Sequence, residues 1–421
     1  MNAATTLHWL TSLRNLGSAL GLERTQLLLE RLNNPQNSCP YFHIAGTNGK
    51  GSTSVMIEAI QRAHGRRTGL YTSPHLIELG ERIQINREPM TENRLIDLVE
   101  QLRTHYEFIH QTRPELDATF FELMTAVAWT EFRDAKVDLA IIETGLGGRL
   151  DATNVGRPVV CVITSIGLDH QEYLGNTIAE IAAEKAGILK SGVPCVVGFV
   201  PPEAEVVIRS RAKEVGAPLY FVRDRFKNEL PLTNLKGLHQ RQNAGAALLA
   251  CDLATAFAID NDTARVALQN VEWPARWQEI KLPDGRTLIV DGSHNEEGIS
   301  LTSSLLRELK SPTVILGSLS SVRAEALIKT VAESAGEIIL VSIDHERALS
   351  ADDLKKLVPK SFLGRIKIAL IKDLFPAPQQ YSVTGSTIVV IGSLYLAGEV
   401  LARYYGKKLN PHLQDKLMNR S

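Results

Sequence analysis

From residue 41 onward, short apolar runs alternate with longer segments in which apolar residues recur at helical spacing. The runs predict buried strands over 41–45, 68–72, 137–143, 159–164, 194–200 and 218–222. The longer segments predict helices over 51–64, 119–132, 177–190 and 203–214, and an alanine-rich stretch predicts another over 241–257. Alternation of this kind is typical of a mostly parallel sheet covered by helices. We therefore expect an α/β fold.

The pattern restarts near Glu272–Arg276. Two apolar runs flanking Asp284-Gly285 predict a hairpin over 277–291. Strands are expected at 313–316, 337–343, 366–371 and 386–391, and helices between them near 295–310, 323–335 and 351–358. This arrangement predicts a second, smaller α/β unit, and we place the two domains at 1–273 and 274–421.

Composition narrows the class of partner. The 421 residues hold 46 Lys and Arg against 47 Asp and Glu, a net charge of −1. This balance argues against nucleic acid as the main partner, although local basic loops can still bind a small anion. No run of 18 apolar residues occurs, so we expect no membrane span.

The cysteines bear on the compartment. Cys39, Cys161, Cys195 and Cys251 form no CxxC pair, and two of them lie inside apolar runs. Buried, reduced thiols are the expected state, which suits a reducing cytosol. The N-terminus shows no basic stretch before an apolar run, so we expect no signal peptide and a cytoplasmic protein.

A glycine-rich loop is the strongest local motif. The string Gly46-Thr-Asn-Gly-Lys-Gly-Ser52 follows an apolar strand and opens a helix, the context that a phosphate-binding loop requires. Lys50 would neutralise phosphate oxygens, and the Ser52 hydroxyl would bind Mg²⁺. The string departs from GxxxxGK[ST], because Ile44 occupies the first glycine position and Gly51 is inserted before the serine. The alternative is a simple glycine turn between strand and helix.

Polar residues follow several predicted strands where each one ends. Ser52, Ser73, Glu143 and His170 should therefore share one edge of the sheet, where α/β proteins bind ligands. Hydroxyl, carboxylate and phosphate oxygens suit Mg²⁺. His170 taken singly is more often structural. The Gly145-x-Gly147 string lacks the third glycine of a dinucleotide fingerprint, which argues against a dinucleotide cofactor at this loop.

Lys185 lies on the apolar face of its predicted helix, with Ile178 and Ile181. One reading is that its stem packs while the amine reaches solvent, and the residues alone favour this reading. The other is an active-site lysine whose depressed pKa leaves a neutral amine, which could react with CO₂ to form a metal-binding carbamate.

The second unit carries similar residues at its strand ends. Asp291 and His294 lie where a strand stops and a helix begins, although Asp291 could equally cap that helix. Ser393 ends the last strand, before a helix N-terminus that could receive a carboxylate. Asn243 and Arg276 are unremarkable when taken alone.

Taken together, these strings resemble the folylpolyglutamate synthase and dihydrofolate synthase branch of the Mur ligase superfamily. The matching strings run in order through nearly the whole chain: 45–52, 71–76, 81–83, 119–122, 143–154, 164–170, 184–188, 291–295 and 392–393. The resemblance implies a Mur-ligase-like P-loop domain that binds ATP, followed by a smaller Rossmann-like α/β domain that binds glutamate. It also implies an amide ligase with its active site between the two.

By resemblance, an ATP-activated acyl phosphate would react with the amine of L-glutamate, and the acids would be dihydropteroate and reduced folates. Lys50, Glu143, His170 and Lys185 would be catalytic, with Lys185 carbamylated. The implied ATP-binding residues are Thr47, Asn48, Gly49, Lys50, Gly51, Ser52, Asn243, Arg276 and Asp291. Two Mg²⁺ ions would be held by Ser52, Ser73, Glu143, His170 and Lys185. The pterin would contact Ala19, Leu20, Gly21, Thr119, Leu150, Asp151 and Ala152, and glutamate would contact His294 and Ser393.

The chain departs from the family pattern in three places. Ser293 stands where alanine is expected and Glu296 where proline is usual, beside the glutamate pocket. Ala19 stands where bacterial bifunctional enzymes carry an acidic residue, which bears on the use of dihydropteroate.

Other functions share part of this pattern. A monofunctional folylpolyglutamate synthase stays open, as does a ligase for another acid. Peptidoglycan-precursor ligases, however, usually carry an extra N-terminal domain, and only 42 residues precede the motif that starts at His43. A GTPase would need an Asn-Lys-x-Asp string, which is absent, and an ATP-binding scaffold would not explain the strand-end metal set. We expect a monomer.

Overall fold

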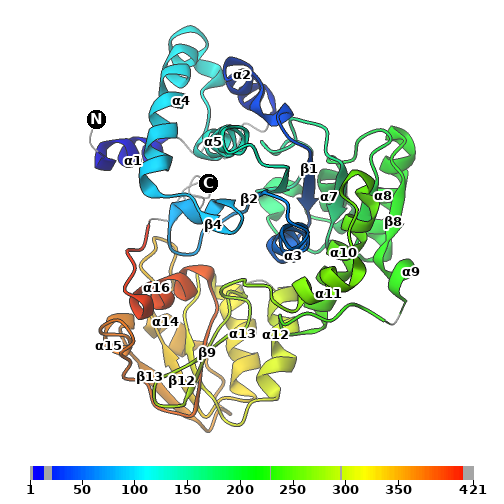
Figure 1. Ribbon diagram of the computed structural model, residues 1–421. Helices are drawn as coiled ribbons and strands as arrows, with labels where there is room; N and C mark the ends of the chain where they lie inside the picture. The colour runs from blue at the N-terminus through cyan, green and yellow to red at the C-terminus, as the bar shows by residue number, and fades with distance from the viewer. Residues whose placement is uncertain (1–2, 14–20, 228, 294–295, 411–421) are drawn as a thin grey trace.

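The computed structural model describes residues 3–13, 21–227, 229–293 and 296–410, which fold around two separate sheets (Figure 1). We call the parts built on them the eight-stranded unit and the six-stranded unit. In Figure 1 the six-stranded unit, in yellow to red, lies below the eight-stranded unit.

The first sheet has the strand order β4-β3-β2-β5-β1-β6-β7-β8. The pairs from β2 to β8 are parallel, and β3 and β4 add an antiparallel hairpin at one edge. The strands are β1 Tyr41–Ala45, β2 Thr68–Tyr71, β3 Ile83–Ile85, β4 Glu88–Pro89, β5 Leu139–Glu143, β6 Val160–Ile163, β7 Cys195–Val197 and β8 Leu219–Phe221. All six predicted strands are present, while the β3–β4 hairpin was not predicted.

Side-chain alternation divides this sheet between two layers of helices. Leu139 and Ile141 face α3 (Lys50–Ala63), α10 (Leu238–Leu253) and α11 (Asn261–Leu268). Ala140 and Ile142 face the opposite way. The helices on that side are α1 Ala3–Ser12, α2 Glu23–Arg31, α4 Glu92–Thr112 and α5 Phe120–Asp134, with α7 Ile178–Ala186 and α8 Pro202–Val215 over β6 to β8. Burial on both faces explains why these strands are continuously apolar.

The second sheet has the order β13-β12-β11-β14-β10-β9, parallel except for β9. Its strands are β9 Gln278–Lys281, β10 Thr287–Val290, β11 Thr313–Leu316, β12 Glu337–Leu340, β13 Arg365–Ile368 and β14 Thr387–Ile391. Helices α12 Glu296–Arg307, α13 Ser321–Ala332 and α14 Ala351–Lys356 cover one face, and α15 Ile371–Leu374 and α16 Leu394–Tyr405 cover the other. The α/β fold expected from the sequence is confirmed in both units.

Some predicted helix ends were wrong. The helix expected over 177–190 ends at Ala186, because Gly187 caps it and the next two residues enter the core. The helix expected over 241–257 spans 238–253, and a 3₁₀ turn follows at Thr255–Phe257. Short helices α6 (Gln171–Leu174) and α9 (Val222–Phe226) and 3₁₀ turns at Pro35–Asn37, Leu79–Arg82 and Pro114–Leu116 complete the described elements.

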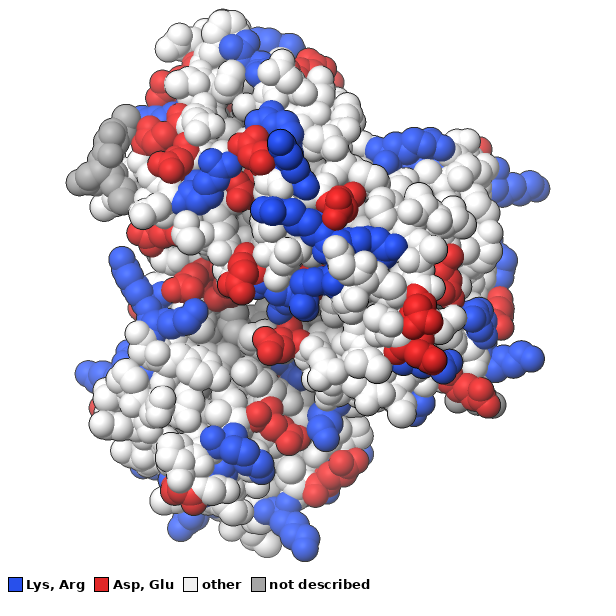
Figure 2. Space-filling view, viewed as in Figure 1, with Lys and Arg blue, Asp and Glu red and all other residues white. Residues whose placement is uncertain are grey.

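Polar contacts join the units at places away from the linker, residues 272–276. The Asn410 backbone N–H donates to the Ile77 carbonyl at 2.8 Å, and the Asn410 Oδ1 accepts from the Leu79 N–H at 2.9 Å. Arg323 forms an ion pair with Asp169 elsewhere on the interface. Between the units the surface is hollowed (Figure 2). No helix in the described part of the chain is long and apolar enough to cross a membrane.

Candidate active site

The glycine-rich loop joins β1 to α3 and is held by the end of β6. The Thr47 N–H donates to the Ser165 carbonyl at 2.8 Å, and the Asn48 N–H donates to the Ser165 hydroxyl at 3.0 Å. The Thr47 hydroxyl accepts from the Gly167 N–H at 3.0 Å. The N–H groups of Thr47 and Asn48 therefore hold the loop in shape. The N–H groups of the first turn of α3 are the ones that point out of the helix N-terminus.

Glycine is required at position 49. Its φ of +82° lies in the left-handed region, and a Cβ there would come within 2.4 Å of the Asn243 Oδ1. The Asn243 side chain, from α10, therefore lies against the loop.

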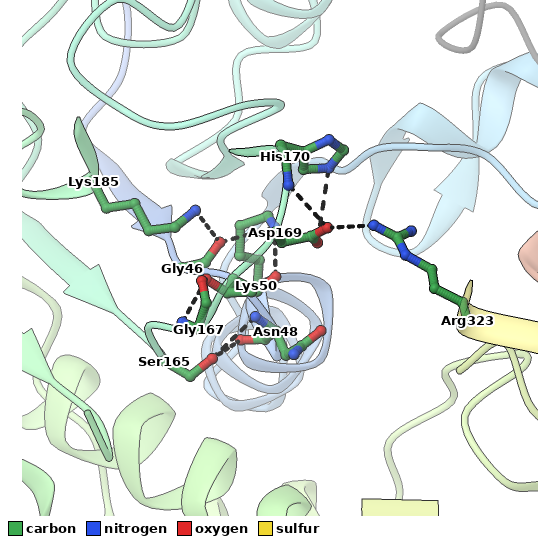
Figure 3. A network of polar contacts seen from close by, with 10 residues as sticks. Gly46, Asn48, Lys50, Ser165, Gly167, Asp169, His170, Lys185 and Arg323 are labelled. Carbon is green, nitrogen blue, oxygen red and sulfur yellow. Dashed lines mark hydrogen bonds and ion pairs between the residues drawn. The ribbon is translucent and has the colours of Figure 1, made fainter. Parts of the chain in front are cut away.

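Lys50 turns back over its own loop (Figure 3). Its Nζ donates to the carbonyl oxygens of Gly46 at 3.0 Å and Thr47 at 3.2 Å. The ammonium group thus lies inside the curve of the loop. In this position it can exchange carbonyl oxygens for phosphate oxygens without a large movement.

Glu143 ends β5 beside the loop and is 4% exposed. Its carboxylate accepts a hydrogen bond from the Ser73 N–H at 3.1 Å, and a Cβ on Gly51 would lie 3.5 Å from its Oε2. Burial raises the pKa of Glu143 to about 7, although the nearby Lys50 opposes the shift. A buried carboxylate of this kind is costly unless a cation accompanies it.

These donors fit Mg²⁺. Ser52 is buried in the first turn of α3, and the Glu143 carboxylate that accepts the Ser73 N–H lies beside the loop, so both residues offer the hard oxygen atoms that Mg²⁺ prefers. Within the described ranges, no three His, Cys, Asp or Glu side chains cluster as a preformed metal centre. A cation here would therefore complete its coordination with nucleotide phosphate oxygens and water, as Mg²⁺ usually does.

His170 follows β6 and precedes α6, with a left-handed φ of +49°. Its backbone N–H donates to the Asp169 Oδ1 at 3.1 Å, and its Nε2 lies 3.8 Å from the Asp169 Oδ2. Burial lowers the pKa of His170, with Asp169 opposing. Burial therefore favours the neutral imidazole, which is the form that binds metals.

Lys185 approaches the loop from α7. It is 4% exposed, and its Nζ donates to the Gly46 carbonyl at 2.8 Å (Figure 3). The solvent-reaching amine that the residues alone favoured was therefore wrong, because α7 packs its apolar face directly against the sheet and the loop. Burial, and then Lys50, lowers the pKa of Lys185 to about 7.

Residues of the linker and of the six-stranded unit complete this region. Arg276 is partly buried, and both Asp291 and Glu143 act on it electrostatically. Asp291 accepts from the N–H groups of Trp277 at 2.8 Å and Ser293 at 2.9 Å. Its carboxylate thus fixes the turn after β10, while α12 begins only at Glu296.

The residues expected at the substrate mainly stabilise their own loops. Thr119 caps α5 through a reciprocal pair with Glu122, and Asp151 accepts from the N–H groups of Leu146 and Thr153. Ala152 is buried, whereas Gly21 and Leu150 are partly exposed. Ser393 caps α16 by accepting from the Tyr395 N–H at 3.1 Å. Ala19, Leu20 and His294 lie outside the described residues.

Sequence reasoning missed Ser165 and Asp169, which support the loop and His170. The string 164–170 predicts a ligand through its histidine, and its density of polar groups at a strand end is the signal that points to Ser165 and Asp169. Arg323, which contacts Asp169 from the other unit, gave no such signal.

Comparisons with known proteins identify the family. Residues 44–222 match the family described as the Mur ligase middle domain. The dihydrofolate synthase/folylpolyglutamate synthase of Bacillus subtilis is 37% identical, over 94% of this chain and 97% of that protein.

Solved structures match over nearly the whole length. The folylpolyglutamate synthase of Thermotoga maritima superposes with a TM-score of 0.85 at 28% identity, covering 98% of this chain and 99% of that one. An FPGS–AMPPCP–folate complex gives a TM-score of 0.79 at 31% identity, covering 95% and 98%. The chain therefore belongs to the dihydrofolate synthase/folylpolyglutamate synthase family and is an ATP-dependent ligase.

Proposed function

We propose that this ligase adds L-glutamate to dihydropteroate, giving dihydrofolate, and to reduced folates, giving folylpolyglutamates. The observation that carries the proposal is the meeting of Lys50, Lys185 and Glu143 at one phosphate loop. Relatives with both names, and a relative's complex with an ATP analogue and folate, support it.

Lys50 would bind the transferring phosphoryl group while the substrate carboxylate attacks it and ADP leaves. The amine of glutamate then attacks the acyl carbon, phosphate leaves, and the amine loses a proton. Ser52, Ser73, Glu143 and His170 would hold two Mg²⁺ ions, which neutralise the charge that develops on the phosphates. Thr47, Asn48, Gly49, Gly51, Asn243, Arg276 and Asp291 would position ATP around them.

Lys185 would carry a carbamate. Its amine is neutral in part near neutral pH, so it can add CO₂ and release a proton. The anion formed would replace the hydrogen bond to Gly46 and contribute oxygen ligands to a metal.

We assign ATP binding to residues 1–273 and glutamate binding to residues 274–421. The pterin would contact Ala19, Leu20, Gly21, Thr119, Leu150, Asp151 and Ala152, and glutamate would contact His294 and Ser393. The near-balanced charge supports small-molecule partners rather than nucleic acid, and the four buried free cysteines support the cytoplasm. We propose a monomer.

An amide-forming assay tests the function. The protein receives ATP, L-glutamate and either dihydropteroate or a reduced folate, and mass spectrometry detects the glutamyl adduct. Adducts with both acids support the bifunctional assignment, and an adduct with reduced folate alone reduces it to a folylpolyglutamate synthase. No adduct with either acid, in protein that binds ATP, would overturn the substrate assignment.

A further inference from the structure

Polar contacts hold the two units together at places that differ in character. At one, backbone and side-chain atoms of Asn410 pair with the backbone of Ile77 and Leu79, and Lys407 forms an ion pair with Glu78. At the other, a single arginine side chain reaches across. The arginine contact is a charge-assisted hydrogen bond, which is stronger than a neutral one.

That arginine is Arg323, near the start of α13. Its Nη2 lies 3.1 Å from the Asp169 Oδ1, and Figure 3 shows it extending from the six-stranded unit toward the phosphate loop. The Arg323 side chain is 40% exposed, whereas that of Asp169 is only 10% exposed. The pair therefore joins a solvated cation to a largely buried anion.

Asp169 passes this contact to His170. The Oδ1 that receives Arg323 also accepts the His170 backbone N–H, and the Oδ2 faces the imidazole at 3.8 Å. His170 has a left-handed backbone, which is sparsely populated for a histidine and needs support from its surroundings. The carboxylate supplies that support.

We propose that Arg323 is a positioning residue that docks the six-stranded unit onto Asp169 and thereby orients His170 at the phosphate loop. The inference rests on the proposed function, since it concerns the same site. Docking of this kind would place the imidazole and align the glutamate-binding end with the acyl phosphate through one contact.

Kinetics give the first test, with Arg323→Ala, Arg323→Lys and a matched control. Arg307→Ala is that control, because Arg307 forms an exposed pair with Glu333 inside the six-stranded unit, at 3.0 Å. We expect Arg323→Ala to lower kcat about tenfold or more through misalignment, with the KM for ATP changed by less than about twofold. Arg323→Lys should recover part of the loss. Equal kinetics for Arg323→Ala and Arg307→Ala would overturn the proposal.

A second measurement does not depend on activity. All four native cysteines are buried, so thiols introduced by Val206→Cys on α8 and Leu363→Cys before β13, both at highly exposed positions, can carry spin labels. We expect Arg323→Ala to broaden the distance distribution between the labels, and Arg307→Ala to leave it unchanged. Adding Asp169→Asn to Arg323→Ala should broaden the distance distribution no further, since both substitutions remove the same Arg323–Asp169 contact.

The ligation assay and the spin-label distances distinguish failure of the proposed substrates from failure of the docking role of Arg323. If no acid is ligated but Arg323→Ala still broadens the distribution, the proposed substrates fail while the docking contact stands. If the distribution is unchanged, the docking role fails even in a fully active ligase.

Discussion

Lys185 and Lys50 donate to the same acceptor, the carbonyl oxygen of Gly46, at 2.8 and 3.0 Å. Two ammonium groups on one carbonyl repel each other, and Lys185 is the more deeply buried of the two. Burial and this repulsion together depress the pKa of Lys185. The arrangement therefore keeps a reactive amine available beside the phosphate loop.

Carbamylation of Lys185 should rise with pH. With a pKa of about 7, the amine is mostly protonated near pH 6 and mostly neutral near pH 8. We expect a carbamate signal from ¹³C-bicarbonate in NMR spectra that grows across this range and is absent in Lys185→Ala. Lys190→Ala, a few residues further on, is the control and should keep the signal. A carbamate signal that persists in Lys185→Ala would contradict the assignment.

Lys50→Ala should abolish ligation, by about a thousandfold or more, because the transferring phosphoryl group loses its cation. The fold should be retained, since Lys50 is only partly buried. Removing this charge should also raise the pKa of Lys185 and move the carbamylation midpoint to higher pH. Circular dichroism checks the fold, and the NMR titration checks the shift. Substantial ligation by a folded variant would refute the role of Lys50.

Glu143→Gln should inactivate the enzyme yet stabilise the metal-free protein above neutral pH. The folded pKa of about 7 lies above the ordinary value of 4.5, so ionisation costs stability as the pH rises from the lower value through the higher. Below both values the carboxyl is neutral in both states and the variant gains little. Near pH 8 we expect a gain on the order of 3 kcal/mol, seen as a higher Tm. Glu172→Gln, at an exposed position, should show no such trend.

Gly49→Ala should lower the stability of the protein more than a glycine replacement that meets no neighbouring atom. Gly65→Ala is a matched control, because Gly65 has a similar φ of +76° but nothing within 4 Å of a Cβ. Backbone strain should cost about 1 kcal/mol in both variants. Gly49→Ala must also displace Asn243, so it should lower the free energy of unfolding further and weaken ATP binding. Calorimetry with and without nucleotide measures the stability and the ATP binding of both variants. Equal losses in Gly49→Ala and Gly65→Ala would mean that the Asn243 side chain moves aside at no cost.

The parallel sheets were predictable because strands buried on both faces are continuously apolar, as Tyr41–Ala45 is. The long helix α4 was missed although Leu95, Leu98, Val99 and Leu102 show helical spacing, because it lies in a long insertion between β4 and β5 rather than in a strict alternation.

The site was predictable only in part. The shared edge of Ser73, Glu143 and the loop follows from strand direction alone. The pairing of Arg323 with Asp169 does not, since the two are 154 positions apart and meet only through the docking of two units. Likewise, the sequence placed Lys185 on the correct face, but its burial depends on how closely α7 packs against the phosphate loop.

The bonds between Asn410 and the 77–79 loop have a consequence for synthesis. Leu79 and its partner are 331 positions apart, so the ribosome makes the loop long before the residue that secures it. The phosphate loop and the eight-stranded sheet are complete well before then. A growing chain therefore completes the phosphate loop and the eight-stranded sheet before the contact that secures the six-stranded unit can form, and the last described residues to emerge join the two units.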